Sequence, residues 1–223
     1  MIYEIRKINN EYYIYSNSIK ILTPNKYPLK TKSKKHARIL LREIKKKNNK
    51  TKSHSILNLT FFSINLSKID KIEIIKKLLK ILQNDYILFR NFNDKLLINY
   101  MNKNFGTLIE NFSLEFDLPL KIQTDFTNNV KYTNENFTSW LMNLENDRFT
   151  ALYKLANISD STILSYFFIK KKIRCKRFFK LVNIEYNYQQ QRWGTLDEHK
   201  ERESYFLEVV ENINLFLKVT NNF

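Results

Sequence analysis

The chain has 223 residues, enough for one ordinary domain with a proper core or for two small ones. Its content of 43% hydrophobic and 14% aromatic residues excludes an intrinsically disordered protein, and no apolar run approaches the length of a membrane-spanning helix. The net charge of +16 is attributed to a composition rich in Lys, Asn and Ile, because the lysines are spread along the chain. The alternative is a basic nucleic-acid-binding protein that uses the Lys-rich helix from Lys32 to Lys52.

Residues 1 to about 30 are expected to form a small β meander. The predicted strands are 2–8, 12–15 and 19–23. Asn9-Asn10 joins the first two strands, because asparagine tolerates the positive φ angles of a tight hairpin, and Asn17-Ser18 offers the next turn. Pro24 and Pro28 then interrupt the ladder, since proline has no N–H to donate.

A helix is predicted from about Ser33 to Lys47, with one apolar stripe and lysines over the rest of its surface. The stripe consists of Ala37, Leu40, Leu41 and Ile44. His36 follows two lysines and is expected on the solvated face of this helix. The apolar segment 56–66 is interpreted as a strand or a buried connector, and the domain boundary is placed just after it.

From Ser67 onward, apolar residues recur with helical spacing and the loops are short, which is typical of a compact helical bundle. The expected helices begin at Ser67, Asp94, Asn134, Asp147, Ser159 or Asp160, Cys175 and Leu196, and the last two end near Arg192 and Val219. The predicted N-caps among these residues are Asp94, Asp147 and either Ser159 or Asp160. The first is expected to bury Ile72, Ile75, Leu79 and Leu82, and the second Leu97, Met101, Phe105, Leu108 and Phe112. We therefore predict an α+β fold, in which a small β-rich N-terminal domain with one helix (residues 1–66) precedes a larger all-helical domain (residues 67–223).

The sequence lacks the motifs of common catalytic and cofactor sites. With only two glycines, Gly106 and Gly194, neither a dinucleotide fingerprint nor a P-loop can be written. The three histidines are far apart, and none is spaced with Cys175 like a zinc site. We therefore expect no catalytic residue, cofactor, metal or small-molecule substrate, and hence no enzyme. The single cysteine excludes an internal disulfide, so a cytoplasmic protein is expected.

The segment 189–199 has a composition that suits recognition better than chemistry. Trp193 offers a large amphipathic surface, and Gly194 permits a break between two helices. Two interpretations are open for Trp193: an anchor in a protein interface, or a core residue that locks the last two helices together. Asp197 and Glu198 follow within a turn, where carboxylates also interact favourably with the helix dipole.

Four short stretches match the sequence motifs of one known protein family. They are Ile19-Lys20-Ile21-Leu22-Thr23-Pro24, Leu59-Thr60, Asp85-Tyr86-Ile87-Leu88-Phe89-Arg90 and Gln189-x-x-x-Trp193-Gly194-x-x-Asp197. Together they resemble the family of assembly chaperones for the α subunit of the F-type ATP synthase catalytic sector. The last stretch is the most specific, and Asp197 stands where that family has glutamate. The chain departs from the family before the first stretch, where Asn17-Ser18 replaces Asp-Gly.

The resemblance implies a chaperone without cofactor or catalysis, made of a β-rich domain and a larger helical domain. It also implies that the chain binds free ATP synthase α subunit and covers the apolar face destined for the β neighbours, which aggregates when bare. The expected protein-binding residues are Gln189, Trp193, Gly194, Asp197 and Glu198. Asp197 matches the family's best-known functional position. The implied location is the bacterial cytoplasm, with eukaryotic members in the mitochondrial matrix, and no membrane insertion is expected.

Overall fold

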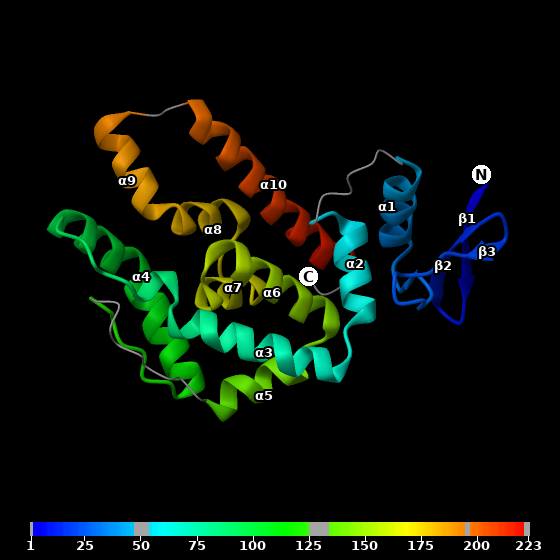
Figure 1. Cartoon of the computed structure of the whole chain (residues 1–223), viewed down its shortest axis with the longest axis horizontal. Helices are drawn as coiled ribbons and strands as arrows, with labels where there is room; N and C mark the ends of the chain where they lie inside the picture. The colour runs from blue at the N-terminus through cyan, green and yellow to red at the C-terminus, as the bar shows by residue number, and fades with distance from the viewer. Residues whose placement is uncertain (1, 47–53, 125–133, 195–196, 221–223) are drawn as a thin grey trace. The chain divides into compact units, whose positions relative to one another are not determined.

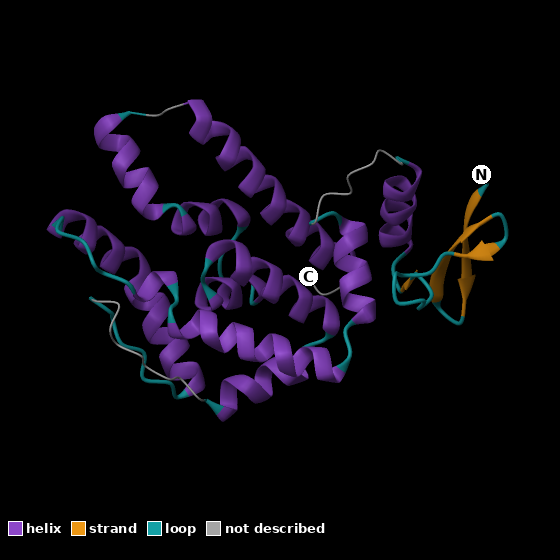
Figure 2. Cartoon of the chain, viewed as in Figure 1, coloured by secondary structure: helices purple, strands orange, loops and turns teal. Residues whose placement is uncertain are grey.

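The computed structural model describes residues 2–46, 54–124, 134–194 and 197–220, apart from the side chains of residues 197–202. It confirms the predicted α+β fold, in which a four-stranded antiparallel sheet is followed by helices (Figures 1 and 2). The chain divides into two compact units. Unit 1 contains residues 1–68, 145–151 and 211–223, and unit 2 contains residues 69–144 and 152–210. The domain boundary near residue 66 stays a prediction.

The strands are β1 (Tyr3–Ile8), β2 (Glu11–Ser16), β3 (Ile19–Lys20) and β4 (Lys30–Thr31). The helices are α1 (Lys34–Lys45), α2 (Ile56–Asn65), α3 (Lys68–Gln83), the 3₁₀ turn η1 (Tyr86–Leu88), α4 (Lys95–Phe116), α5 (Glu135–Asn143), α6 (Asn146–Ser159), α7 (Thr162–Ile169), α8 (Cys175–Val182), α9 (Ile184–Trp193) and α10 (Asp197–Val219). The helix expected over 175–192 is thus two helices, because Asn183 ends α8 and precedes α9. No helix in the described ranges is long and apolar enough to cross a membrane.

β2 is the centre of the sheet, since β1, β3 and β4 all pair with it in antiparallel register. Both predicted turns are confirmed: Asn9 and Asn10 have φ of 47° and 62°, and Asn17 and Ser18 have φ of 47° and 63°. Two successive positive φ angles are those of the hairpin turn whose twist matches the flanking strands. β2 thereby presents Ile14, which is fully buried, to the core of unit 1.

The predicted helix α1 is confirmed, but the expectation for His36 is wrong. The Ser33 side chain caps the helix by accepting a hydrogen bond from the His36 backbone N–H. The His36 imidazole is only 2% exposed, and its two nitrogens lie 2.8 Å from the hydroxyls of Thr31 and Thr60. His36 precedes Leu40 by four residues, so it lies on the buried stripe despite its lysine neighbours.

The interpretation of 56–66 as a strand or connector is wrong, because these residues form α2. A near-continuous apolar run carries no period that separates a buried helix from a strand. The deciding groups cap the helix: the Ser55 hydroxyl accepts from the backbone N–H of Asn58. The Glu43 carboxylate on α1 accepts from the N–H groups of Ile56 and Leu57 at 3.2 and 2.7 Å.

The start of α6 completes unit 1 and corrects a predicted cap. The Asn146 side-chain amide donates to the backbone carbonyls of Ser63 and Leu66, both at 3.1 Å, and so satisfies the end of α2. Asp147 lies inside the first turn of α6, where its carboxylate accepts a hydrogen bond from the Ser63 hydroxyl. It therefore holds α6 against α2 and is not the cap that the sequence predicted.

Unit 2 confirms the predicted core face of α4, since all five residues of that stripe are buried. The prediction for α3 is right for Ile75 and Leu82, but Ile72 is 46% exposed and Leu79 is only partly buried. The buried face of α3 instead includes Lys71, whose ammonium donates to the Leu144 carbonyl at the end of α5 at 2.5 Å. A lysine that caps a helix end can lie in an otherwise apolar face.

α7 is buried along its whole length, and its cap also differs from the prediction. The helix begins after Ser161, whose hydroxyl accepts from the backbone N–H of Leu164, and neither Ser159 nor Asp160 is the cap. Asp160 instead adopts a left-handed φ of 48°, and its carbonyl accepts from the N–H of Tyr86 at 2.9 Å. Ile163, Leu164, Phe167 and Phe168, which recur with helical spacing, are all buried.

The buried imidazole predicts a specific pH dependence of stability. Burial lowers the pKa of His36 to about 4, whereas an unfolded chain has an ordinary histidine pKa near 6.5. As the pH falls from about 6.5 to 4, the unfolded state binds a proton at His36 and the folded state does not. The contribution of the lowered pKa to the free energy of unfolding is therefore fully present above about pH 6.5 and is lost as the pH falls towards 4. We expect the wild-type free energy of unfolding to fall by roughly 3 kcal/mol relative to that of His36→Gln over this range.

Chemical unfolding of both proteins at a series of pH values measures this difference. Glutamine can donate to one threonine hydroxyl and accept from the other, but it does not titrate. Parallel stability curves for the two proteins would show that the imidazole is not buried in its neutral form.

Candidate protein-binding surface

The C-terminal end of α9 carries the residues that the sequence singled out. Gly194 ends the helix with a φ of 87°, a conformation that a residue with a side chain rarely adopts, and its N–H donates to the Gln190 carbonyl at 2.9 Å. This confirms the predicted break before α10. Gln189 and Trp193, one helical turn apart, are both exposed.

Trp193 is 75% exposed, so the interpretation of this side chain as a core residue is wrong. The other tryptophan of the chain, Trp140, is partly buried and packs against aromatic rings. Its ring lies within 5.2 to 5.8 Å of the rings of Phe116, Phe137 and Tyr166. A large apolar side chain left in solvent is a candidate for an interface anchor, because burying it later releases free energy.

A cluster centred on Asp94 fixes the end of α9 to the start of α4. The Asp94 carboxylate accepts from the Tyr188 hydroxyl and the Arg192 guanidinium, both at 2.9 Å. It also caps α4 by accepting from the backbone N–H groups of Leu96 and Leu97. The Arg192 guanidinium lies 4.8 Å from the centre of the Tyr188 ring. We call Asp94, Tyr188 and Arg192 the α4–α9 clamp.

The hydrogen-bond donors around Asp94 keep its carboxylate ionised. Partial desolvation works to raise the pKa of Asp94, but the hydrogen bonds from Tyr188 and the two backbone N–H groups, with the charge of Arg192, bring it below its ordinary value. The carboxylate is thus ionised at neutral pH and attracts Arg192. Because Arg192 immediately precedes Trp193, the clamp holds in place the backbone from which the exposed indole extends.

The clamp also brings an apolar part of α4 beside α9. Leu96 is 60% exposed and Tyr100 is 39% exposed, and the Tyr100 ring lies 6.1 Å from the ring of Tyr188. Leu96, Tyr100 and Trp193, which we call the apolar triad, are therefore presented by neighbouring parts of unit 2. The sequence contained a signal for the two α4 residues: they are four apart and fall outside the buried stripe of that helix.

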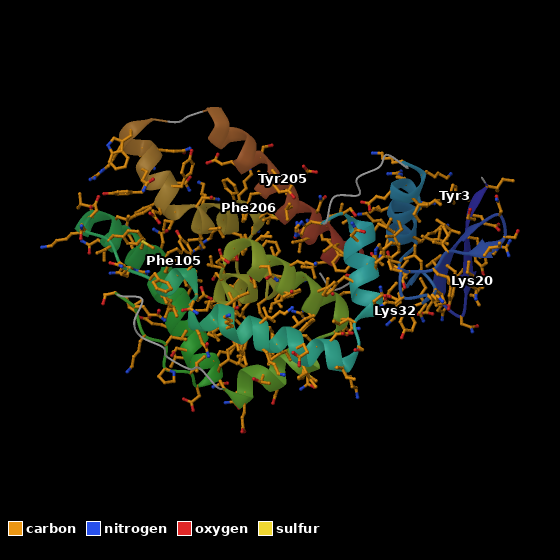
Figure 3. All side chains as sticks on the ribbon, in the orientation of Figure 1. Tyr3, Lys20, Lys32, Phe105, Tyr205 and Phe206 are labelled. Carbon is orange, nitrogen blue, oxygen red and sulfur yellow. The ribbon has the colours of Figure 1, made fainter. Side chains whose placement is uncertain are left out.

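α9 is also linked to the part of α10 that belongs to unit 2. The Gln190 amide donates to the Glu203 carboxylate at 3.5 Å. Phe206 of α10 stacks on Phe178 of α8 with a centroid distance of 6.5 Å, and Phe206 is labelled in Figure 3. Asp197 and Glu198 begin α10, but their side chains lie outside the described part of the chain. Their role in binding stays a prediction.

Other chemistry is not assembled in the described residues. They contain no group of three His, Cys, Asp or Glu side chains placed to hold a metal ion. Cys175 is partly buried at the first turn of α8. A shallow hollow of about 370 Å³ beside α3 is lined by Lys77, Lys80, Ile81, Asn84, Asn157 and Asp160.

The fold is shared with proteins of known structure at low sequence identity. No family model and no curated protein sequence matches the chain. Atp12 from Paracoccus denitrificans is 19% identical, with a TM-score of 0.74 over 98% of this chain and 95% of that chain. A mutant of the Paracoccus protein, in which an aspartate is replaced by lysine, gives a TM-score of 0.78 at 18% identity over the same shares. Atu1473 of Agrobacterium tumefaciens, a candidate chaperone, gives 0.81 at 14% identity over 97% of this chain and 83% of that one.

The two tryptophans provide a matched test of the exposed site. Trp193→Ser is expected to change the free energy of unfolding by less than about 0.5 kcal/mol, because the ring makes few contacts that folding creates. Trp140→Ser is expected to lower it by at least about 2 kcal/mol, because it leaves a cavity among three aromatic rings. Urea unfolding followed by circular dichroism measures both. A comparable loss in the two variants would show that Trp193 is packed in solution.

Proposed function

We propose that the chain is an assembly chaperone that binds the free α subunit of the F-type ATP synthase and shields its β-facing surface while the catalytic sector assembles. The fold similarity supports this proposal, because it extends over 98% of the chain and over nearly all of the Paracoccus protein named Atp12. The sequence resemblance to the α-subunit chaperone family points to the same partner.

Three of the four matching stretches contribute buried residues that hold the fold, and the fourth contributes exposed residues. In the first three stretches, Thr23, Thr60, Asp85 and Arg90 are at most 4% exposed. Each of them makes hydrogen bonds that hold the fold: the Thr23 hydroxyl donates to the Asn65 side chain at 2.6 Å, and Arg90 donates to the carbonyls of Ile87 and Phe89. Residues of this kind are retained for packing and say little about a partner.

The fourth stretch differs, because Trp193 and Gln189 are exposed and no hydrogen bond or ring contact of theirs holds the fold together among the described residues. A match at an exposed tryptophan needs an explanation outside the folding of the chain itself, and recognition of a partner is the simplest one. This single observation carries the assignment of the binding surface to the end of α9.

The apolar triad suits such a task. An unassembled subunit exposes apolar surface that aggregates, and a chaperone must cover part of it with apolar groups of its own. Exposed Leu96 and Tyr100 on α4, with Trp193 at the end of α9, provide contact area. The α4–α9 clamp fixes the helix ends that carry these side chains, which reduces the entropy lost on binding. Asp197 and Glu198 at the start of α10 would supply charge at the rim, where charge mainly affects association rate and specificity.

Co-expression with the α subunit tests the proposal. We expect wild-type chain to keep the free α subunit in the soluble fraction, and Trp193→Ser to weaken the complex at least tenfold, since buried aromatic anchors cost about 2 kcal/mol or more when truncated. Asp197→Lys is expected to weaken it as well without unfolding the chaperone. Fractionation of cell lysates and titration of purified α subunit measure the two effects.

Leu114→Ser is the matched control, because Leu114 is 80% exposed near the opposite end of α4 from the clamp. It removes a similar apolar side chain from the same unit and is expected to leave binding unchanged. If the α subunit is equally soluble with and without the chaperone, the proposed function is wrong. If Leu114→Ser and Trp193→Ser weaken the complex equally, the function stands but the surface is misplaced.

A further inference from the structure

The positive charge of the chain is concentrated near its N-terminus. Residues 2–46 contain twelve Lys and Arg but only three Asp and Glu, so about a fifth of the chain carries +9 of the total charge of +16. Lysines occur along the whole chain, but acidic residues are scarce in this segment, so the net charge is uneven. α1 contributes five of these twelve cations, and Lys46 at its C-cap is a sixth.

The exposed cations of α1 lie along one side of the helix. They are Lys34, Lys35, Arg38, Arg42, Lys45 and Lys46, the last being the C-cap residue. At 3.6 residues per turn, these positions fall within about a third of the helix circumference and extend over about 18 Å of its axis. We call this set the α1 stripe.

No carboxylate neutralises the α1 stripe among the described side chains, whose ion pairs all lie elsewhere. Glu43 is the only acidic residue of α1, and its carboxylate is occupied by the backbone N–H groups of Ile56 and Leu57. Six like charges on one helix face repel each other, which costs stability. A surface that carries this unfavourable repulsion is a candidate for binding a polyanion.

We propose that the α1 stripe binds the phosphodiester backbone of a nucleic-acid duplex, without reading its sequence. A duplex carries one negative charge per about 1.7 Å of its axis, which provides several phosphates along the length of the stripe. Protein interfaces have cores depleted in lysine and anchored by apolar or aromatic side chains, and the α1 stripe contains none. The site is independent of the apolar triad, which belongs to unit 2.

Two other polyanions fit the stripe less well. The opposite face of α1 packs Ala37 and Leu40 into unit 1, so the helix has no free apolar face to insert between lipids. Single-stranded nucleic acid is usually held by aromatic rings that stack on bases. On the neighbouring sheet, the rings of Tyr12, Tyr13 and Tyr15 are already covered by cations: Lys7, Lys20 and Arg6 lie 4.5 to 6.0 Å from their centres.

The experiment measures binding of the full chain to a short DNA duplex of mixed sequence over a range of salt concentrations. The stripe variant carries K35Q, R38Q and R42Q. The matched control carries K171Q, K172Q and K176Q, which removes the same charge from exposed positions around the start of α8. We expect the slope of log K against log salt to decrease in magnitude by about 3 in the stripe variant and to change little in the control.

Three results would overturn the proposal. An equal change of slope in both variants would mean that the duplex responds only to overall charge. An unchanged slope in the stripe variant, with loss of binding to vesicles containing anionic lipid, would assign the stripe to a membrane surface. An unchanged slope with weaker binding of the ATP synthase α subunit would assign it to an acidic protein surface. Because the duplex is the readout, failure of the chaperone function leaves this test intact.

Discussion

The complete burial of α7 is the constraint on which the packing of unit 2 depends. A helix buried on every side needs partners inside the protein for the backbone groups at its ends. Asp85 supplies one by accepting from the N–H of Ile163 at 3.0 Å, and the Ser161 hydroxyl supplies another by accepting from the N–H of Leu164 at 3.0 Å. Burial raises the pKa of Asp85 to about 7 although several hydrogen bonds favour its charged form. A carboxylate is thus kept in the core because the helix end requires an acceptor there.

The aromatic core extends from this buried helix to its neighbours. The ring of Tyr166 on α7 lies 5.1 to 5.3 Å from those of Phe112, Phe116 and Trp140, which come from α4 and α5. Mostly edge-to-face contacts of this kind are directional, so they fix the rotation of α4 as well as its distance. With α4 fixed, Asp94 at its start has a defined position. The clamp can then orient the end of α9, and the exposed indole depends on the buried core in this way.

The sequence predicted those elements whose signals are local. The stripe of α4 was predicted residue by residue because five apolar side chains repeat with helical spacing, and the hairpins because Asn9-Asn10 and Asn17-Ser18 tolerate positive φ. α2 was missed because its apolar run has no period, and what makes it a helix includes Glu43, thirteen residues before its start. The pairing of Asp94 with Arg192 spans 98 positions, and no local pattern marks the two residues as partners.

The same distinction explains why the candidate site was only half predicted. Trp193 and Gly194 were found because their types are rare in this chain, whereas their exposure depends on tertiary packing that a sequence does not show. His36 failed in the opposite direction: its lysine neighbours suggested solvent, but its position four residues before Leu40 placed it in the core. Neighbours in sequence are a poor guide to burial on a helix, where residues three and four apart share a face.

The use of acidic residues as internal acceptors links the fold to both proposed surfaces. Glu43, Asp85, Asp94 and Asp147 each accept hydrogen bonds that position a helix. In residues 2–46, where acids are few, losing Glu43 to the α2 cap leaves the α1 stripe unneutralised. In unit 2, Asp94 forms an ion pair with Arg192 and so neutralises the cation that precedes Trp193 in the sequence. A strongly charged surface is thereby left on unit 1 and a largely apolar one on unit 2, which suits two partners of different chemistry.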